Sequence, residues 1–248
     1  MDWKGARMAT MPELVAVLEN HRVDTGATLE LFGRRLREAS RVTKGKRGRG
    51  AAQMTYLDAA RLLIACAATD HPERAVDAEY EFSNTLLHLD RGDTTHFLDA
   101  HSAPTLDKAL ASVLEGFANG AIDDAERDRR NELMPGADTF NIPVMPVVWL
   151  IVHRSGVQAQ LRVRDETFHY AHRALIAIGN AQPGNDLTER ARDYEHATTR
   201  FRGGKNLRAE LDSGLLRAVA NLIGGAPASR SMSLPASVTA LLETHRHG

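Results

Sequence analysis

The sequence predicts a mostly helical α+β fold in which one β-hairpin interrupts the helices. Apolar residues recur at helical spacing through most of the 248 residues. Between residues 142 and 164 the pattern changes to an apolar run followed by strict alternation, which is typical of strands. Near residue 45, a glycine-rich basic stretch separates two helical segments.

Two short helices are expected first. One covers about residues 12–21 and has a proline in its first turn, where proline is well tolerated. The second begins near Thr25 or Thr28 and follows a link, 22–27, whose glycine favours a steep turn between helices.

The second helix is expected to be amphipathic and cationic. Its apolar stripe consists of Leu29, Phe32 and Leu36. Arg34, Arg35 and Arg37 fall off this stripe, so they are expected on the exposed face.

Residues 41–54 are expected to leave the helical pattern. Glycines at positions 45, 48 and 50 oppose a helix, so the stretch predicts a short strand with a basic loop. Thr55 is a suitable helix N-cap with Asp58 three residues later, and a strongly apolar helix is expected to follow.

Beyond residue 70, further helices surround the predicted hairpin. The strands within 142–164 are joined by residues 153–156, which predicts a β-hairpin. The predicted helices cover about 73–89, 105–118, 122–133, 167–179, 187–200, 206–223 and 235–245.

Charge divides the chain unequally. Residues 1–69 hold 12 Lys and Arg against 7 Asp and Glu, whereas residues 70–248 hold 19 against 25. Between Arg34 and Arg49 there are eight cations and a single acid, Glu38. A basic end on an otherwise acidic protein points to a polyanionic partner.

Composition indicates a soluble cytoplasmic protein. The single cysteine, Cys66, cannot form an intramolecular disulfide, lies in an apolar run, and fits a reducing compartment. No stretch reaches the roughly 18 consecutive apolar residues of a membrane span, and the N-terminus lacks the apolar region of a signal peptide.

Read together, residues 12–68 resemble the winged helix-turn-helix of bacterial transcription regulators and of phage or mobile-element DNA-binding proteins. The resemblance is carried by residues 28–39, the Arg- and Gly-rich turn and the apolar helix after it; a helix in that position is loosely similar to the MerR branch. It implies that the second helix enters the major groove and that the wing lies over the backbone or minor groove. Residues 1–70 would then form a winged helix-turn-helix DNA-binding domain, and 71–248 a dimerisation or sensing domain.

Ten residues are candidates for DNA contact. Thr28 and Glu30, near the start of the second helix, are expected to meet base edges. The others are cations expected to meet phosphates or the minor groove: Arg34, Arg35, Arg37, Arg41, Lys44, Lys46, Arg47 and Arg49. A solvated helix face and an ordinary surface loop are the alternative interpretations.

No enzyme, cofactor or metal motif is visible. The histidines lack a completing thiol or carboxylate set, and no nucleophile-elbow, phosphate-loop or dinucleotide fingerprint occurs. Trp149, Phe168 and Tyr170 could line an effector pocket, but packing in the core is the simpler interpretation.

The function expected from the sequence is sequence-specific binding of double-stranded DNA. The expected role is that of a homodimeric transcription regulator of a prophage or mobile element, with a small-molecule effector as an option. Small-terminase-like DNA recognition and an accessory role in recombination share the same chemistry. A different class also stays open, an interaction protein whose basic segment docks on an acidic partner or RNA.

Overall fold

The computed structural model is α+β and mostly helical, as the sequence predicts. It describes residues 9–44, 52–88, 105–135, 148–163, 166–181, 184–201 and 207–225. The helices are α1 (Met11–Asn20), α2 (Gly26–Glu38), α3 (Tyr56–Ala68), α4 (Ala75–Ser83), α5 (Leu106–Ala118), α6 (Ala121–Leu133), α7 (Arg173–Gly179), α8 (Asn185–Thr198) and α9 (Ser213–Gly224). The strands are β1 (Leu86–His88), β2 (Val148–His153), β3 (Gln158–Val163), β4 (Glu166–Ala171) and β5 (Arg208–Leu211).

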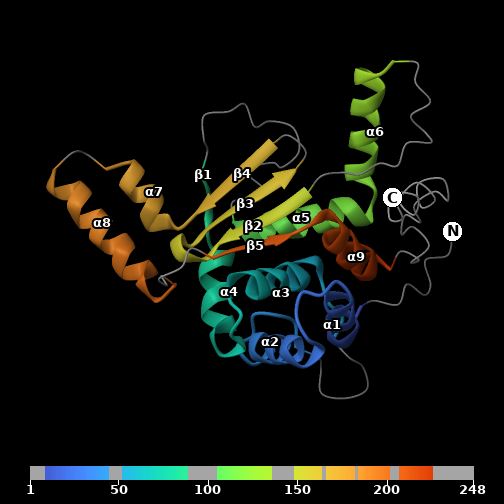
Figure 1. Cartoon of the computed structure of the whole chain (residues 1–248), viewed down its shortest axis with the longest axis horizontal. Coiled ribbons are helices and arrows are strands. Elements are labelled where there is room, and N and C mark those ends of the chain that lie inside the picture. The colour runs from blue at the N-terminus through green and yellow to red at the C-terminus, as the bar shows by residue number, and fades with distance from the viewer. Residues whose placement is uncertain are drawn as a thin grey trace, which may run out of the picture.

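One antiparallel sheet occupies the middle of the described fold. Its strand order is β1-β4-β3-β2-β5, so the predicted hairpin, β2 and β3, forms its centre. Figure 1 shows α3, α5 and α9 beside the sheet, with α1 and α2 on the far side of α3. The α7–α8 hairpin and α6 project away from this body.

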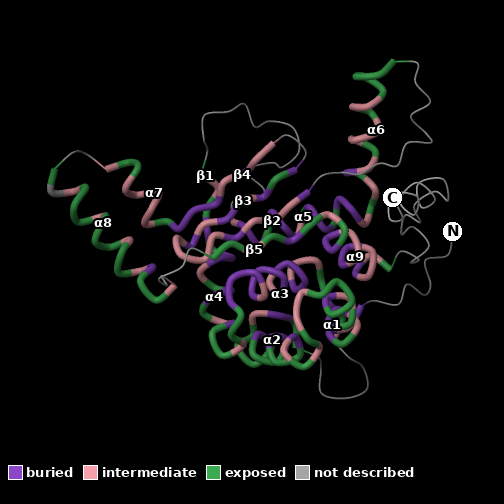
Figure 2. The backbone as a smooth tube through the Cα atoms, viewed as in Figure 1, coloured by how far each residue is buried: buried purple, intermediate pink, exposed green. Residues whose placement is uncertain are grey.

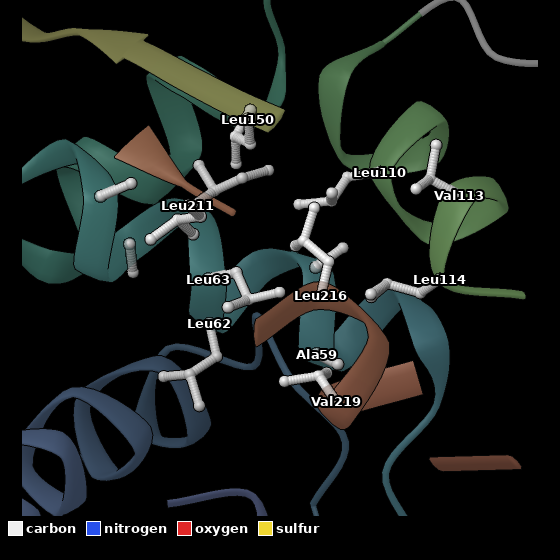
Figure 3. Close-up of a cluster of buried hydrophobic side chains, with 14 of the residues drawn as sticks. Ala59, Leu62, Leu63, Leu110, Val113, Leu114, Leu150, Leu211, Leu216 and Val219 are labelled. Atoms are coloured by element: carbon white, nitrogen blue, oxygen red, sulfur yellow. The ribbon is translucent and has the colours of Figure 1, made fainter. Parts of the chain in front are cut away.

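The core forms between the sheet and α3. Alternation along β2 and β3 turns Leu150 and Leu161 inward as cross-strand partners. Leu62 and Leu63 of α3 and Leu216 of α9 are also fully buried, and they lie in the same cluster as Leu150 (Figure 3). The buried backbone in Figure 2 accordingly concentrates around α3 and the sheet.

This core continues across residue 70. Buried side chains from Ala9 to Ile223 belong to a single hydrophobic cluster, in which α3 packs on α5 and α1 packs on α9. The division at residue 70 stays a prediction about function, since the packing joins both parts in one core.

Three predicted helices are shorter than expected because strands replace part of each. The segment 73–89 becomes a 3-10 turn, α4 and then β1; 167–179 becomes β4 and α7; 206–223 becomes β5 and α9. β1 and β5 pair with strands far away in the sequence, whereas β4 pairs with the distant β1 and also with the adjacent β3. The periodicity of a short sequence window does not reveal which strands pair in the sheet. The helices predicted over these strand residues were therefore wrong.

The other elements agree closely with the sequence. Helices predicted at 12–21, 105–118, 122–133 and 187–200 are confirmed within two residues, as is the helix capped by Thr55. The helix predicted at 235–245 lies outside the described residues. Among the described helices, none combines the length and apolarity that a bilayer crossing demands.

Candidate nucleic-acid interface

Helix α2 lies on the surface with one buried stripe. Leu29, Phe32 and Leu36 are at most 1% exposed, as their spacing predicts. Gly33 completes the stripe, and a Cβ there would come within 2.9 Å of the Met11 sulfur. The glycine therefore allows α1 and α2 to pack closely and leaves the remaining faces of α2 to solvent.

The exposed face of α2 is basic at its C-terminal half. We call Arg34, Arg35, Arg37 and Lys44 the α2 basic surface. Both Arg34 and Arg35 approach the Glu38 carboxylate, at 3.6 and 3.7 Å, and their side chains are 58% and 48% exposed. Such exposed pairs contribute little to stability, so the guanidinium groups can exchange partners readily.

Lys44 extends this surface past the end of the helix. Its Nζ donates to the Glu38 carbonyl oxygen at 3.3 Å, where the last carbonyls of a helix attract cations. Arg37 is exposed and has no ion-pair partner among the described residues. The α2 basic surface thus holds four cations, of which Arg34 and Arg35 approach the Glu38 carboxylate.

Arg41 has a different environment from its basic neighbours. Its Nη2 donates to Glu79 Oε1 at 2.9 Å, its Nε donates to the other carboxylate oxygen, and its guanidinium stacks over the Tyr80 ring. The Glu79 side chain is completely buried, and the Ser83 hydroxyl also donates to it. The hydrogen bond to Glu79 raises the pKa of Arg41, so the guanidinium stays charged. The structure does not place Arg41 with the α2 basic surface.

A second arginine, Arg61, ties this pair to α5. It donates to the Arg41 carbonyl oxygen at 2.9 Å and forms an ion pair with Asp107, which is 5% exposed. We call Arg41, Arg61, Glu79 and Asp107 the buried charge network. It was not predicted from the sequence, because its partners are 38 and 46 residues apart.

The chain leaving the network is held by Asp58. This carboxylate is 4% exposed, caps α3 by accepting from Thr55 N–H at 2.9 Å, and also accepts from the Thr43 amide and hydroxyl at 2.8 Å. The capping box expected at Thr55 is confirmed. Asp58 therefore fixes the backbone immediately before Lys44.

Strands flanking a wing do not occur in the described residues 41–44 and 52–54. Lys46, Arg47 and Arg49, predicted on the wing, lie outside the described residues.

The N-terminal end of α2 is acidic. The Glu19 carboxylate accepts from Gly26 N–H at 2.8 Å, and Asp24 accepts from Thr25 N–H at 2.7 Å. Thr28 is half-buried and its hydroxyl pairs with Thr25 at 2.9 Å, within the helix cap. Carboxylates at this end would repel phosphates, so the basic surface at the other end is the better contact region.

Thr28 and Glu30 do not lie side by side. Residues two apart on an α-helix are separated by about 200° around its axis. Glu30 is exposed on the flank that carries Arg37, whereas Thr28 lies on the flank that carries Arg35. One groove floor therefore cannot meet both residues in the same way.

The three aromatic residues considered for an effector pocket do not converge. Phe168 and Tyr170 point into the core and are at most 2% exposed. Trp149 lies on the opposite face of the sheet, where the Arg162 guanidinium stacks over its ring. For Phe168 and Tyr170 the structure places the side chains in the core.

The chain matches no known protein family, no curated protein and no solved structure.

Proposed function

We propose that this protein binds double-stranded DNA through the α2 basic surface and acts as a transcription regulator. The proposal rests mainly on one observation, the four exposed cations of the α2 basic surface, which lie with a single acid, Glu38, at the C-terminal half of α2 and just beyond it. Cations on a rigid surface release counterions when they meet phosphates, which supplies much of the affinity for DNA.

The anchoring of the neighbouring chain supports this proposal. Asp58 and the buried charge network hold residues 41–43, and three further cations, Lys46, Arg47 and Arg49, follow in the sequence. A basic segment that starts from a fixed point loses less conformational entropy on binding than a free tail. DNA would approach the C-terminal half of α2, and the base-reading roles of Thr28 and Glu30 stay predictions.

The test is a salt titration with two charge-matched variants. We expect R34Q/R35Q/R37Q to reduce the slope of log affinity against log salt by about 2.7, because each phosphate contact contributes about 0.9. The control, R127Q/R129Q/R192Q, removes the same charge from α6 and α8 and should keep the slope. Fluorescence anisotropy with a labelled duplex measures both.

Sequence specificity needs a separate measurement. A regulator should select a preferred site from a random duplex library at physiological salt, and the selected site should bind at least about 10³-fold more tightly than bulk DNA. A selection without enrichment would contradict specific recognition. Equal slopes for the two triple variants would contradict α2 as the DNA-binding helix.

Dimerisation belongs to the same proposal. Helix-turn-helix regulators commonly read two half-sites about 34 Å apart with two copies of the chain. A palindromic selected site together with a dimeric mass by light scattering would agree with this arrangement.

One observation favours the alternative of a protein-docking surface. Leu31 is 41% exposed and lies near the centre of the outward face of α2, beside the turn that carries Arg34. An exposed apolar residue next to arginines, here Arg34 and Arg35 three and four positions later, is typical of interface centres. Leu31→Ala would then abolish partner capture and leave the salt slope on DNA unchanged.

A further inference from the structure

A cleft with several charged lining residues lies between α4, α7 and α8, away from α2. Its volume is about 700 Å³, within the range of small-molecule sites. In Figure 1 the α7–α8 hairpin extends from one end of the sheet, and the end of α8 returns toward α4. The lining residues are Glu81, His172, Arg173, Ala174, Ala177, Arg190, Asp193, His196, Ala197 and Arg200.

Glu81 is the fixed centre of this cleft. Arg200 donates to one of its carboxylate oxygens at 2.5 Å, and His172 Nε2 lies 3.5 Å from the other. The His172 ring is oriented by a hydrogen bond from Ala174 N–H to Nδ1 at 3.2 Å, so the proton of the neutral ring is on Nε2, facing Glu81. The His172 side chain is only 9% exposed, so the cleft wall holds a polar group that is largely buried.

Three lining arginines, Arg173, Arg190 and Arg200, favour an anion and outnumber the two lining carboxylates, Glu81 and Asp193. Arg173 has no ion-pair partner among the described residues, and Arg190 pairs only with Asp186 of its own helix, at 2.8 Å. Arginine is well suited to phosphate, because its planar fork donates two parallel hydrogen bonds. Alanines at 174, 177 and 197 leave the cleft open and add small apolar surfaces beside the charged groups.

We propose that this cleft binds a phosphorylated polyhydroxy molecule of the sugar-phosphate class. The phosphate would pair with Arg173 and Arg190, and a hydroxyl would donate to Glu81, whose position Arg200 fixes. A free phosphate ion would leave most of the volume unfilled and could not satisfy Glu81 at the same time. The inference does not depend on the proposed DNA binding, because it uses none of the α2 residues.

Calorimetric titration of the full chain tests this. Ribose 5-phosphate and glucose 6-phosphate are the probes, with ribose, glucose and inorganic phosphate as comparison ligands. We expect at least one sugar phosphate to bind about tenfold or more tightly than its sugar and than inorganic phosphate. The free sugar lacks the charge-assisted hydrogen bonds to the arginines, and inorganic phosphate lacks the sugar hydroxyl that donates to Glu81. Binding of no sugar phosphate, or equal binding of inorganic phosphate, overturns the proposal.

A matched pair of variants locates the binding. Arg190→Gln should weaken the sugar phosphate about tenfold. Arg192→Gln, two residues further along α8 and outside the cleft lining, should leave affinity unchanged. If both variants lose the same affinity for the sugar phosphate while their far-ultraviolet circular dichroism spectra remain native, the proposal is overturned. R34Q/R35Q/R37Q should keep full sugar-phosphate affinity even if it loses DNA, so the two proposals fail separately.

Discussion

Arg37 and Arg41 are four residues apart, yet they lie in opposite environments. Arg37 is exposed on α2, whereas the Arg41 side chain is 20% exposed and paired with the buried Glu79 carboxylate. Their sequence contexts are alike, since each belongs to the same run of cations between residues 34 and 49. A single basic run can therefore combine cations that stabilise the fold with cations that are available to a partner.

The backbone at the end of α2 causes this difference. Ser40 adopts φ 59°, and Arg41 N–H donates to the Leu36 carbonyl oxygen at 2.8 Å, which is the pattern of a Schellman motif. This turn ends the helix and redirects the chain, so Arg41 enters the space beside α4. Arg37 stays on the last helical turn.

The largest expected effect is on stability, from Glu79. Glu79→Ala leaves Arg41 without its buried counter-charge, whereas Arg61 keeps Asp107, and it should lower the free energy of unfolding by about 3–5 kcal/mol. Glu38→Ala, which removes an exposed carboxylate, should change it by less than about 0.5 kcal/mol. Urea unfolding followed by circular dichroism measures the free energy of unfolding of both variants. Equal changes would contradict the difference between the buried and the exposed environment.

The next prediction sharpens the same contrast with one substitution at two sites. Arg37→Gln should lower the salt slope on DNA by about 0.9 and leave stability unchanged. Arg41→Gln should do the reverse, because its guanidinium is already held by Glu79. A reduced slope for Arg41→Gln at unchanged stability would assign Arg41 to the DNA surface instead.

A smaller effect is expected at the turn between the two arginines. Ser40 is a non-glycine residue in the left-handed region, a conformation that costs about 1–2 kcal/mol for most side chains. Ser40→Gly removes that strain but increases unfolded-state entropy, so we expect a net gain of a few tenths to about 1 kcal/mol. Ser40→Val should destabilise the protein in the same unfolding assay.

The smallest effect is a pH dependence that arises from two histidines, His172 in the cleft and His153 in β2, and not from α2. Burial lowers the pKa of His172 from its ordinary value of 6.5, and Glu81 opposes this only in part. The unfolded chain therefore takes up the proton first, and stability should fall as pH decreases below about 6.5 toward the native pKa of His172.

Two histidine variants check the assignment. His172→Gln should flatten part of this pH dependence. His153→Gln should flatten another part, because burial also lowers the pKa of His153. Thermal unfolding between about pH 5 and pH 8, around the ordinary histidine pKa of about 6.5, gives the slope of stability against pH for each variant. A profile that neither variant alters would contradict this account.

The sequence by itself determined the local elements. The stripe of Leu29, Phe32 and Leu36 identified α2 and its cationic face, and Thr55 with Asp58 identified the start of α3. These features depend on neighbours within one or two helical turns, so periodicity and capping preferences are sufficient to find them. The alternation in β2 and β3 is local in the same sense.

Only the tertiary structure decided which cations are buried and where the other strands form. Glu79 selects Arg41 across 38 residues, and β1 and β5 form by pairing with strands that are distant in the sequence. The cleft likewise joins Glu81 with Arg200, 119 residues away. Such contacts depend on the packing of the whole core around α3, and no window of sequence contains both partners.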